Sequence, residues 1–157
     1  MGRNTQYFPN ARRTLTVAVQ GAGLKRLFPE SQVSFNKNVS LTWIGKLQPT
    51  PLTETYSVKM RYRLKQRPEV IVVSPELRER NGCRIPHVFP GNELCLFRYQ
   101  YFEWDSTMSV AETIVPWTSL WLLHYEIWLA TGTWCGSKQE HPGEGTAKKP
   151  ENPPQEH

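Results

Sequence analysis

A cysteine and a histidine stand eight residues apart in a segment whose composition excludes a helix. The segment reads Ile85-Pro86-His87-Val88-Phe89-Pro90-Gly91-Asn92-Glu93-Leu94-Cys95-Leu96. Because proline and glycine interrupt helices, it predicts a rigid, bent loop that feeds a short apolar strand. Such a loop can fold His87 back over Cys95, and a thiol beside an imidazole is suited to nucleophilic catalysis. Residue type alone also allows a second interpretation, in which Cys95 is a buried core thiol.

His87 could serve the reaction of such a thiol in three ways. It could donate a hydrogen bond to the oxyanion of a tetrahedral intermediate. It could act as a general base, for the thiol or for an attacking amine, or it could only hydrogen-bond and lock the loop. Imidazole titrates near neutral pH, so a titrating role predicts a pH dependence that a His87→Asn variant lacks. Catalysis also requires the sulfur of Cys95 to be open to solvent and within reach of the imidazole.

Several charged residues stand near this segment in the sequence. If a lysine attacks an acyl group on the thiol, it must first lose a proton, because its pKa is about 10.4. Asp105 could orient that amine or take its proton, or it could only cap a helix. The positive charges of Arg84 and Arg98 would favour the thiolate, whereas Glu93 is expected to be solvated.

A zinc site would need several ligands at suitable spacing. The candidates are Cys83, His87, Cys95 and Cys135, with His124 and His141 as spares. The chain has no Cys-x-x-Cys pair and the spacings match no zinc finger, so we expect no metal. The sequence contains no evident nucleotide or ATP site either, so we expect no cofactor.

The elements that must position these residues follow from hydrophobic periodicity. Residues 11–28 are predicted to form a helix that ends at Pro29. Its expected buried face consists of Leu15, Val19, Ala22 and Leu27. Alternating apolar residues predict strands over 39–47 and 55–64, and the apolar run 70–73 predicts a third. Their short spacing favours an antiparallel meander with one face covered by helix.

After a predicted loop over 76–84 and the cysteine segment, the chain is predicted to return to helix. Asp105 and Ser106 would cap a helix from about Ser109, and Pro116 either breaks that helix or starts its successor. Helical spacing is then shown by Trp117, Leu120, Trp121, His124, Ile127 and Trp128. The apolar stretch 114–130 contains proline, histidine and glutamate, so it predicts a packed helix rather than a membrane span. Its tryptophans, with Trp134, are expected to form core or a partner surface.

The amino-acid composition is typical of a single globular domain. The chain has 157 residues, 38% of them hydrophobic and 21% charged, and it can bury a core without disulfides. Three cysteines favour a reducing compartment, and residues 1–6 lack the apolar run of a secretory signal. We therefore expect a cytoplasmic protein. The predicted divisions are an N-terminal arm over 1–10, a domain over 11–136 and a disordered tail over 137–157.

The net charge of +5 allows a basic nucleic-acid-binding module as an alternative function. The basic residues are scattered, however, and around 59–65 they alternate with Met60, Tyr62 and Leu64, as on a solvated sheet face. Positive charge without a known nucleic-acid-recognition motif is weak evidence for nucleic-acid binding. An acidic partner or a C-terminal carboxylate is an equally good use of that face.

The cysteine segment resembles the active-site loop of ubiquitin-conjugating enzymes. Pro86 matches the proline of that motif, Val88-Phe89 its hydrophobic-aromatic pair, and Leu94-Cys95-Leu96 the nucleophile with its flanks. Two positions depart from the motif. Ile85 stands where the family has histidine, and His87 stands where it has the asparagine thought to support the oxyanion.

A larger set of motifs resembles one bacterial branch, the stand-alone conjugating-enzyme-like proteins of CBASS anti-phage operons. These are encoded beside a cyclic GMP-AMP synthase-like nucleotidyltransferase. The motifs are Trp43-x-Gly45-x-Leu47-Gln48-Pro49-Thr50-Pro51, Tyr56-x-Val58, His87-Val88-Phe89-Pro90, Leu94-Cys95-Leu96 and Ile114-x-Pro116-Trp117-Thr118-Ser119-x-Trp121. In this branch histidine is expected at the position of His87. The predicted element order over about 11–134 is also similar.

This resemblance implies an α+β, ubiquitin-conjugating-enzyme-like fold with an N-terminal helix, an antiparallel meander sheet, a long active-site loop and C-terminal helices. It implies a bacterial transferase that forms a thioester on Cys95, with His87 and Asp105 as further catalytic candidates. The donor would be the C-terminal tail of the nucleotidyltransferase and the acceptor a lysine of a protein, which would regulate anti-phage signalling. The same thiol could also cleave the isopeptide linkage. The alternative to catalysis is a silent adaptor that keeps the fold and binds the cyclase.

Overall fold

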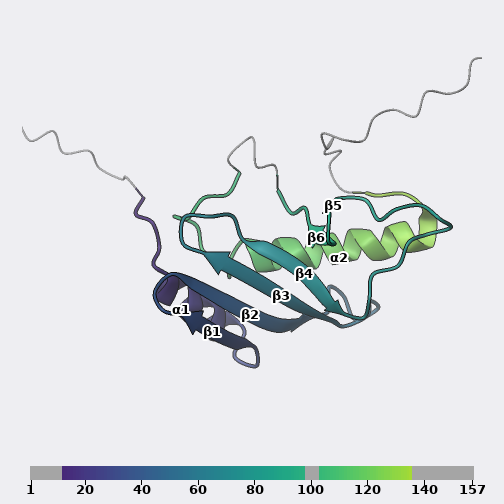
Figure 1. The fold of residues 1–157 in the computed structure, drawn as a ribbon. Coiled ribbons are helices and arrows are strands. Elements are labelled where there is room, and N and C mark those ends of the chain that lie inside the picture. Colours follow the sequence, from purple (N-terminus) through teal and green to yellow (C-terminus); the bar gives the residue numbers. More distant parts are fainter. Residues whose placement is uncertain (1–11, 98–102, 136–157) are drawn as a thin grey trace, which may run out of the picture.

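The computed structural model describes residues 12–97 and 103–135 (Figure 1). Its helices and strands are α1 (Val17–Leu27), β1 (Gln32–Asn36), β2 (Ser40–Leu47), β3 (Tyr56–Arg63), β4 (Glu69–Ser74), β5 (Val88–Phe89), β6 (Glu93–Leu94) and α2 (Ile114–Thr131). The fold is α+β, with an N-terminal helix, a four-stranded antiparallel sheet and a C-terminal helix, which confirms the predicted class. The predicted arm over 1–10 and tail over 137–157 lie outside the described residues, and the domain division stays a prediction.

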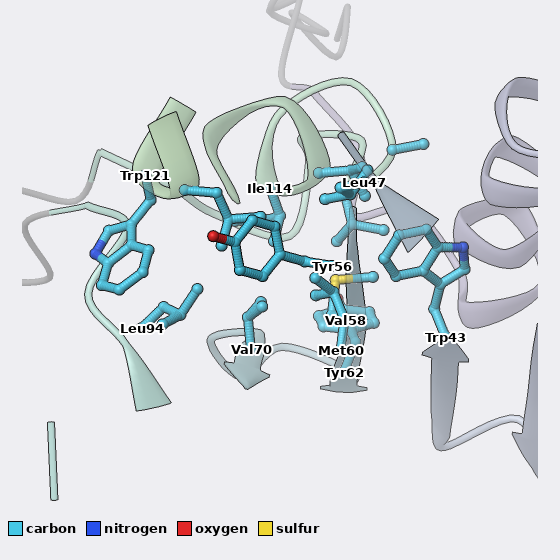
Figure 2. Close-up of a cluster of buried hydrophobic side chains, with 14 of the residues drawn as sticks. Trp43, Leu47, Tyr56, Val58, Met60, Tyr62, Val70, Leu94, Ile114 and Trp121 are labelled. Atoms are coloured by element: carbon cyan, nitrogen blue, oxygen red, sulfur yellow. The ribbon is translucent and has the colours of Figure 1, made fainter. Parts of the chain in front are cut away.

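The central sheet has the strand order β1-β2-β3-β4, and each strand is antiparallel to its neighbours. Side chains alternate between its two faces, and cross-strand pairing sets Trp43 opposite Met60 and Met60 opposite Val70. Together with the other buried strand residues, these side chains point toward α2 in Figure 2. The opposite face exposes Arg61 and Arg63, as the alternation around 59–65 predicts.

Strand β1 is an element that sequence periodicity missed. It forms a hairpin with β2 through a turn in which Lys37 has a φ of 51°. The strand lies at the sheet edge, and four of its five residues are exposed. An edge strand of this kind carries little apolar alternation, which is why the pattern predicted only the other three strands.

The buried face of α1 differs from the predicted one. The helix buries Val17, Gln20, Gly21 and Leu24, whereas Val19 is 52% and Leu27 is 42% exposed. The Gln20 amide donates to the Met108 carbonyl at 2.8 Å and accepts from the Val110 backbone N–H at 2.9 Å. Gln20 thus occupies a core position because its amide forms hydrogen bonds with backbone groups of a neighbouring loop. A prediction from hydrophobicity alone therefore selects the wrong face of the helix.

Helix α2 covers the buried face of the sheet (Figure 1). It begins at Ile114, so the helix predicted from Ser109 is wrong: the residues before Ile114 form turns, and Pro116 lies in the first helical turn. Proline is accepted there because the first-turn N–H groups have no partner within the helix. One helix, rather than several, therefore follows Cys95 within the described part of the chain.

The C-terminal end of α2 turns the chain back toward the rest of the fold. Gly132 has a φ of 79°, a left-handed conformation that glycine adopts without strain. Its N–H donates to the Trp128 carbonyl at 2.8 Å. Arg80 donates from Nε to the Leu129 carbonyl at 3.1 Å, which also satisfies a carbonyl in the last turn. Within the described residues, no helix has both the length and the apolar character to span a membrane.

Candidate active site

The segment that carries His87 and Cys95 is a β-hairpin rather than an irregular loop. Val88 pairs with Leu94 and Phe89 with Glu93. The turn between these strands includes Gly91, with a φ of 82°, and Asn92, with a φ of 59°. Glycine and asparagine are the residues that accept such angles most readily. The hairpin places His87 opposite Cys95, whose N–H donates to the His87 carbonyl at 2.9 Å.

The backbone of His87 is anchored from a second direction. Its carbonyl also accepts a hydrogen bond from Nε1 of Trp121 on α2 at 3.0 Å. The residue has a φ of 55°, in the left-handed region where histidine and asparagine are enriched among non-glycine residues. Two donors from different elements therefore hold the His87 backbone in place.

The sulfur of Cys95 is not open to solvent, contrary to the expectation for a nucleophile. Cys95 is 6% exposed, and its Sγ donates to the Phe97 carbonyl at 3.7 Å. Burial raises the pKa of the Cys95 thiol to about 11. The Arg67 guanidinium acts in the opposite direction, while Glu93 and Glu103 raise the pKa further. The thiol is therefore kept protonated at neutral pH.

Arg67, rather than Arg84, is the described cation that favours the Cys95 thiolate; Arg98 lies outside the described residues. The Arg67 side chain forms an ion pair with Glu93 and lies over the Phe89 ring at 5.2 Å. Glu93 is thus paired, and the expectation that it is simply solvated is wrong. The interaction ties the segment between β3 and β4 to the hairpin.

A pocket of about 350 Å³ brings Cys95 and His87 together. Its walls are formed by His87, Cys95, Leu96, Phe97, Glu103, Trp117, Leu120, Trp121, His124 and Trp134. These residues come from the hairpin and the segments after it, from one face of α2, and from the chain beyond Gly132. Cys95 is therefore buried among packed residues on one side and borders a cavity on the other.

Trp134 is the wall residue that connects these parts. Its ring centroid lies 4.9 Å from that of His87, 5.3 Å from that of Trp121 and 5.9 Å from that of His124. The Nδ1 atom of His124 is buried and has no hydrogen-bond partner among the described residues. Both imidazoles of the pocket thus pack against one indole.

Asp105 lies outside this pocket. It is exposed, and its carboxylate accepts from the Thr107 N–H at 2.8 Å and from the Thr107 hydroxyl at 2.5 Å. These bonds lower the pKa of the Asp105 carboxyl. Asp105 stabilises the turn that precedes α2 without capping the helix, whose N-cap is Thr113. Glu103 is the carboxylate that borders the pocket, and the sequence contained no signal for it.

Other wall residues had a partial signal in the sequence. Trp117, Leu120, Trp121 and His124 follow the spacing of one helical face, but that spacing was interpreted as core or partner surface. Trp134 lies beyond the end of α2, so its place at the pocket depends on the turn at Gly132. In residues 12–97 and 103–135, no group of three or more histidine, cysteine or acidic side chains is arranged to hold a metal ion.

The chain was compared with known protein families. A family model described as Type II CBASS E2 protein matches residues 20–142. The matched range covers most of the chain and includes every residue of the pocket wall. No curated protein matches the chain.

Proposed function

The chain belongs to the family of Type II CBASS E2 proteins, as its motifs predict, and we propose that it transfers an acyl group through a thioester on Cys95. The donor is the C-terminus of a partner protein, the cyclic GMP-AMP synthase-like nucleotidyltransferase of the same operon. The acceptor is a lysine amine. Transfer of this kind would regulate anti-phage signalling.

One geometric observation carries this proposal. Cys95 and His87 border the same pocket, and the Cys95 N–H to His87 carbonyl bond fixes their backbones opposite each other. An imidazole that borders the same pocket as a thiol could stabilise the oxyanion or move a proton as the thiol attacks a carbonyl. Because the hairpin is also anchored to α2 through Trp121, the pair is held on supported structure.

The reaction balances when the donor is already activated as a thioester or an acyl adenylate. The Cys95 sulfur attacks the donor carbonyl, a new carbon–sulfur bond forms, and the leaving group departs with the proton of the thiol. The lysine amine then attacks the Cys95 thioester. A carbon–nitrogen bond forms, the carbon–sulfur bond breaks, and the proton released by the amine returns to sulfur. Donor activation is supplied by another enzyme.

The burial of Cys95 differs from the open sulfur expected of a nucleophile, so the proposal requires the donor carbonyl to reach the sulfur through the pocket that Cys95 borders. The raised pKa of Cys95 has two consequences for such a reaction. A thiolate of higher pKa is intrinsically more nucleophilic, although less of it is present at neutral pH. It is also a poorer leaving group, so a thioester on Cys95 would resist unintended exchange with other thiols. Burial therefore slows formation of the thioester on Cys95 and protects the thioester once it has formed.

The test uses the full chain and the nucleotidyltransferase with its C-terminus converted to a thioester. We expect a covalent adduct on a non-reducing gel, with an intact mass equal to the two chains minus the leaving thiol. Cys95→Ala should abolish the adduct, and Cys95→Ser should give an ester that survives reducing agent. Cys83→Ala is the matched control, because Cys83 is exposed and lies outside the pocket. An adduct that persists in Cys95→Ala would exclude the proposal.

The burial of Cys95 favours one rival, a catalytically silent adaptor that binds the cyclase. The adaptor and the transferase can be distinguished by measuring the phage protection of a strain that carries Cys95→Ala. An adaptor keeps full protection, whereas the transferase loses the part that depends on conjugation. If the same thiol cleaves isopeptide linkages, a preformed conjugate should shorten in the presence of wild type and persist with Cys95→Ala.

A further inference from the structure

The backbone of His87 is fixed, but its imidazole can still rotate. The Cys95 N–H and Nε1 of Trp121 both donate to the His87 carbonyl, at 2.9 and 3.0 Å. These bonds leave the two side-chain torsions of the histidine free. An oxyanion donor or a general base must direct one ring nitrogen toward the reacting group. Either role for His87 therefore requires a contact that orients the ring itself.

Trp134 makes such a contact. Its indole centroid lies 4.9 Å from the imidazole centroid of His87, with the two planes inclined at 50°. Aromatic rings pack favourably at this separation. Because rotation of the imidazole about its torsions would change this contact, the indole restricts the orientations that the ring can adopt.

Helix α2 supports the indole in turn. Trp121 and His124 are three positions apart, so they are neighbours on one face of the helix. Their ring centroids lie 5.3 and 5.9 Å from that of Trp134. Trp121 therefore acts on His87 in two ways, through the hydrogen bond to its carbonyl and through the indole that packs on its ring.

The segment that carries Trp134 has little other packing. Trp134 is half-buried, whereas the residues around it are exposed: Thr131, Gly132, Thr133 and Cys135. Burial in this segment is thus confined to the residue that borders the pocket. This pattern is expected when one side chain, rather than the whole segment, has a role in the fold or the site.

We infer that Trp134 is a positioning residue of the candidate site, whose indole orients the His87 imidazole for acyl transfer at Cys95. The inference rests on the proposed function and adds a residue to it from beyond the end of α2. Trp134 acts through His87 rather than on the reacting atoms, so its effect depends on the imidazole being present.

A double-mutant cycle tests this dependence. Acylation of Cys95 by the nucleotidyltransferase thioester is measured by intact mass in wild type, Trp134→Leu, His87→Asn and the double variant. Leucine keeps the side chain apolar but removes the aromatic ring. We expect Trp134→Leu to slow acylation roughly tenfold in wild type, because misplacing a reacting group lowers the rate steeply. In the His87→Asn background it should change the rate by less than about twofold, since two changes that act through one contact are not additive.

Two further variants separate the ring contact from the stability of the segment. Trp134→Phe keeps an aromatic ring beside the imidazole, so it should retain more of the acylation rate than Trp134→Leu. Thr133→Ala is the matched control, because Thr133 is exposed in the same segment and lies outside the pocket. It should leave the rate unchanged. Urea denaturation of every variant establishes that the compared proteins are folded.

The contact can also be measured without any donor. The ring current of an indole shifts the NMR signals of nearby protons, so Trp134→Leu should move the imidazole proton signals of His87 and His124. These signals are assigned by their loss in His87→Asn and His124→Asn. Thr133→Ala should leave them in place. Unmoved His87 signals in Trp134→Leu would overturn the inference, whatever the activity of the protein.

The kinetic outcomes distinguish failure of the inference from failure of the proposed function. An effect of Trp134→Leu that is absent from wild type, or equal in both backgrounds, would show that Trp134 does not act through His87. Unchanged acylation in His87→Asn would remove the residue through which Trp134 acts. Each of these results would overturn the inference and leave the transferase function intact. Absence of Cys95 acylation in wild type, with His87 signals that do shift, would overturn the function and reduce Trp134 to a packing role.

Discussion

At the scale of single residues, the buried thiol of Cys95 has a measurable signature. Its pKa of about 11 lies above the usual value for cysteine, so the thiolate fraction increases about tenfold for each pH unit from 7 to 10. We expect alkylation of Cys95 in the Cys83→Ser/Cys135→Ser background to accelerate with the same slope. Mass spectrometry against pH measures it. A rate that levels off below pH 9 would contradict the raised pKa.

The role of His87 can be tested without straining the backbone. Asparagine accepts a φ near 55°, so His87→Asn should fold with little loss of stability, whereas alanine would add strain. If the imidazole titrates during transfer, wild type should change rate between about pH 6 and 8 and the variant should not. Single-turnover transfer to lysine measures this. Superimposable pH profiles would eliminate a titrating role.

The Asp105 carboxylate should contribute to stability more than to transfer. Its pKa is lowered by the Thr107 hydrogen bonds, so its contribution is present above the unfolded value of about 3.9 and is lost as the pH falls. Because the group is exposed, Asp105→Ala should reduce the free energy of unfolding by less than about 1 kcal/mol at pH 7. Urea denaturation at pH 7 and 3 measures the difference. A stable variant that cannot transfer to lysine would place the carboxylate in the reaction.

The sequence identified Cys95 and His87 because both belong to one short segment with a specific motif. It did not identify Glu103, Trp134 or Arg67 as neighbours of the thiol, since each comes from another segment. The ion pair between Arg67 and Glu93 joins residues 26 positions apart. Local patterns therefore predicted a candidate site, whereas the charges around Cys95 and its burial depend on tertiary packing.

At the scale of elements, a hydrogen bond joins the hairpin to α2. Trp121 is 4% exposed and donates from Nε1 to the His87 carbonyl. Trp121→Phe keeps an aromatic ring but removes the donor, and we expect it to cost about 1–3 kcal/mol of unfolding free energy. It should also slow acylation of Cys95, because the His87 carbonyl loses the hydrogen bond from α2.

A matched substitution separates loss of packing from loss of that anchor. Trp128 is 5% exposed on the same helix and lies outside the pocket. Trp128→Phe should reduce stability by a similar amount and leave the acylation rate unchanged. Urea denaturation and intact-mass kinetics on both variants give the comparison. Equal acylation rates for the two would show that the Trp121 donor does not position the site.

Strands in which apolar and polar residues alternate regularly were predicted well. Elements whose buried face depends on contacts with other segments were not. β2 and β3 have one buried and one exposed face, so their apolar period identifies both the strand and its orientation. The face of α1 is decided by Gln20, a polar residue that bonds to the loop at Met108 and Val110. Only the position of that loop explains why glutamine is buried there.

At the scale of the whole molecule, the candidate site lies on strands that are much shorter than those of the central sheet. β5 and β6 contain two residues each, whereas β3 contains eight and is flanked by strands on both sides. Backbone amides of β3 should therefore exchange with deuterium far more slowly than those of residues 88–94. Hydrogen exchange followed by mass spectrometry measures this. Equal protection of the two segments would indicate a hairpin as stable as the core.

Trp134, enclosed by two imidazoles and a second indole, makes the protein its own optical probe. Indole emission shifts in colour and intensity with the polarity around the ring, so an arriving acyl group should alter the fluorescence spectrum without any added dye. The chain has six tryptophans, and subtracting the spectrum of a Trp134→Phe variant isolates this one. Loading of the sulfur could then be recorded in real time by stopped flow.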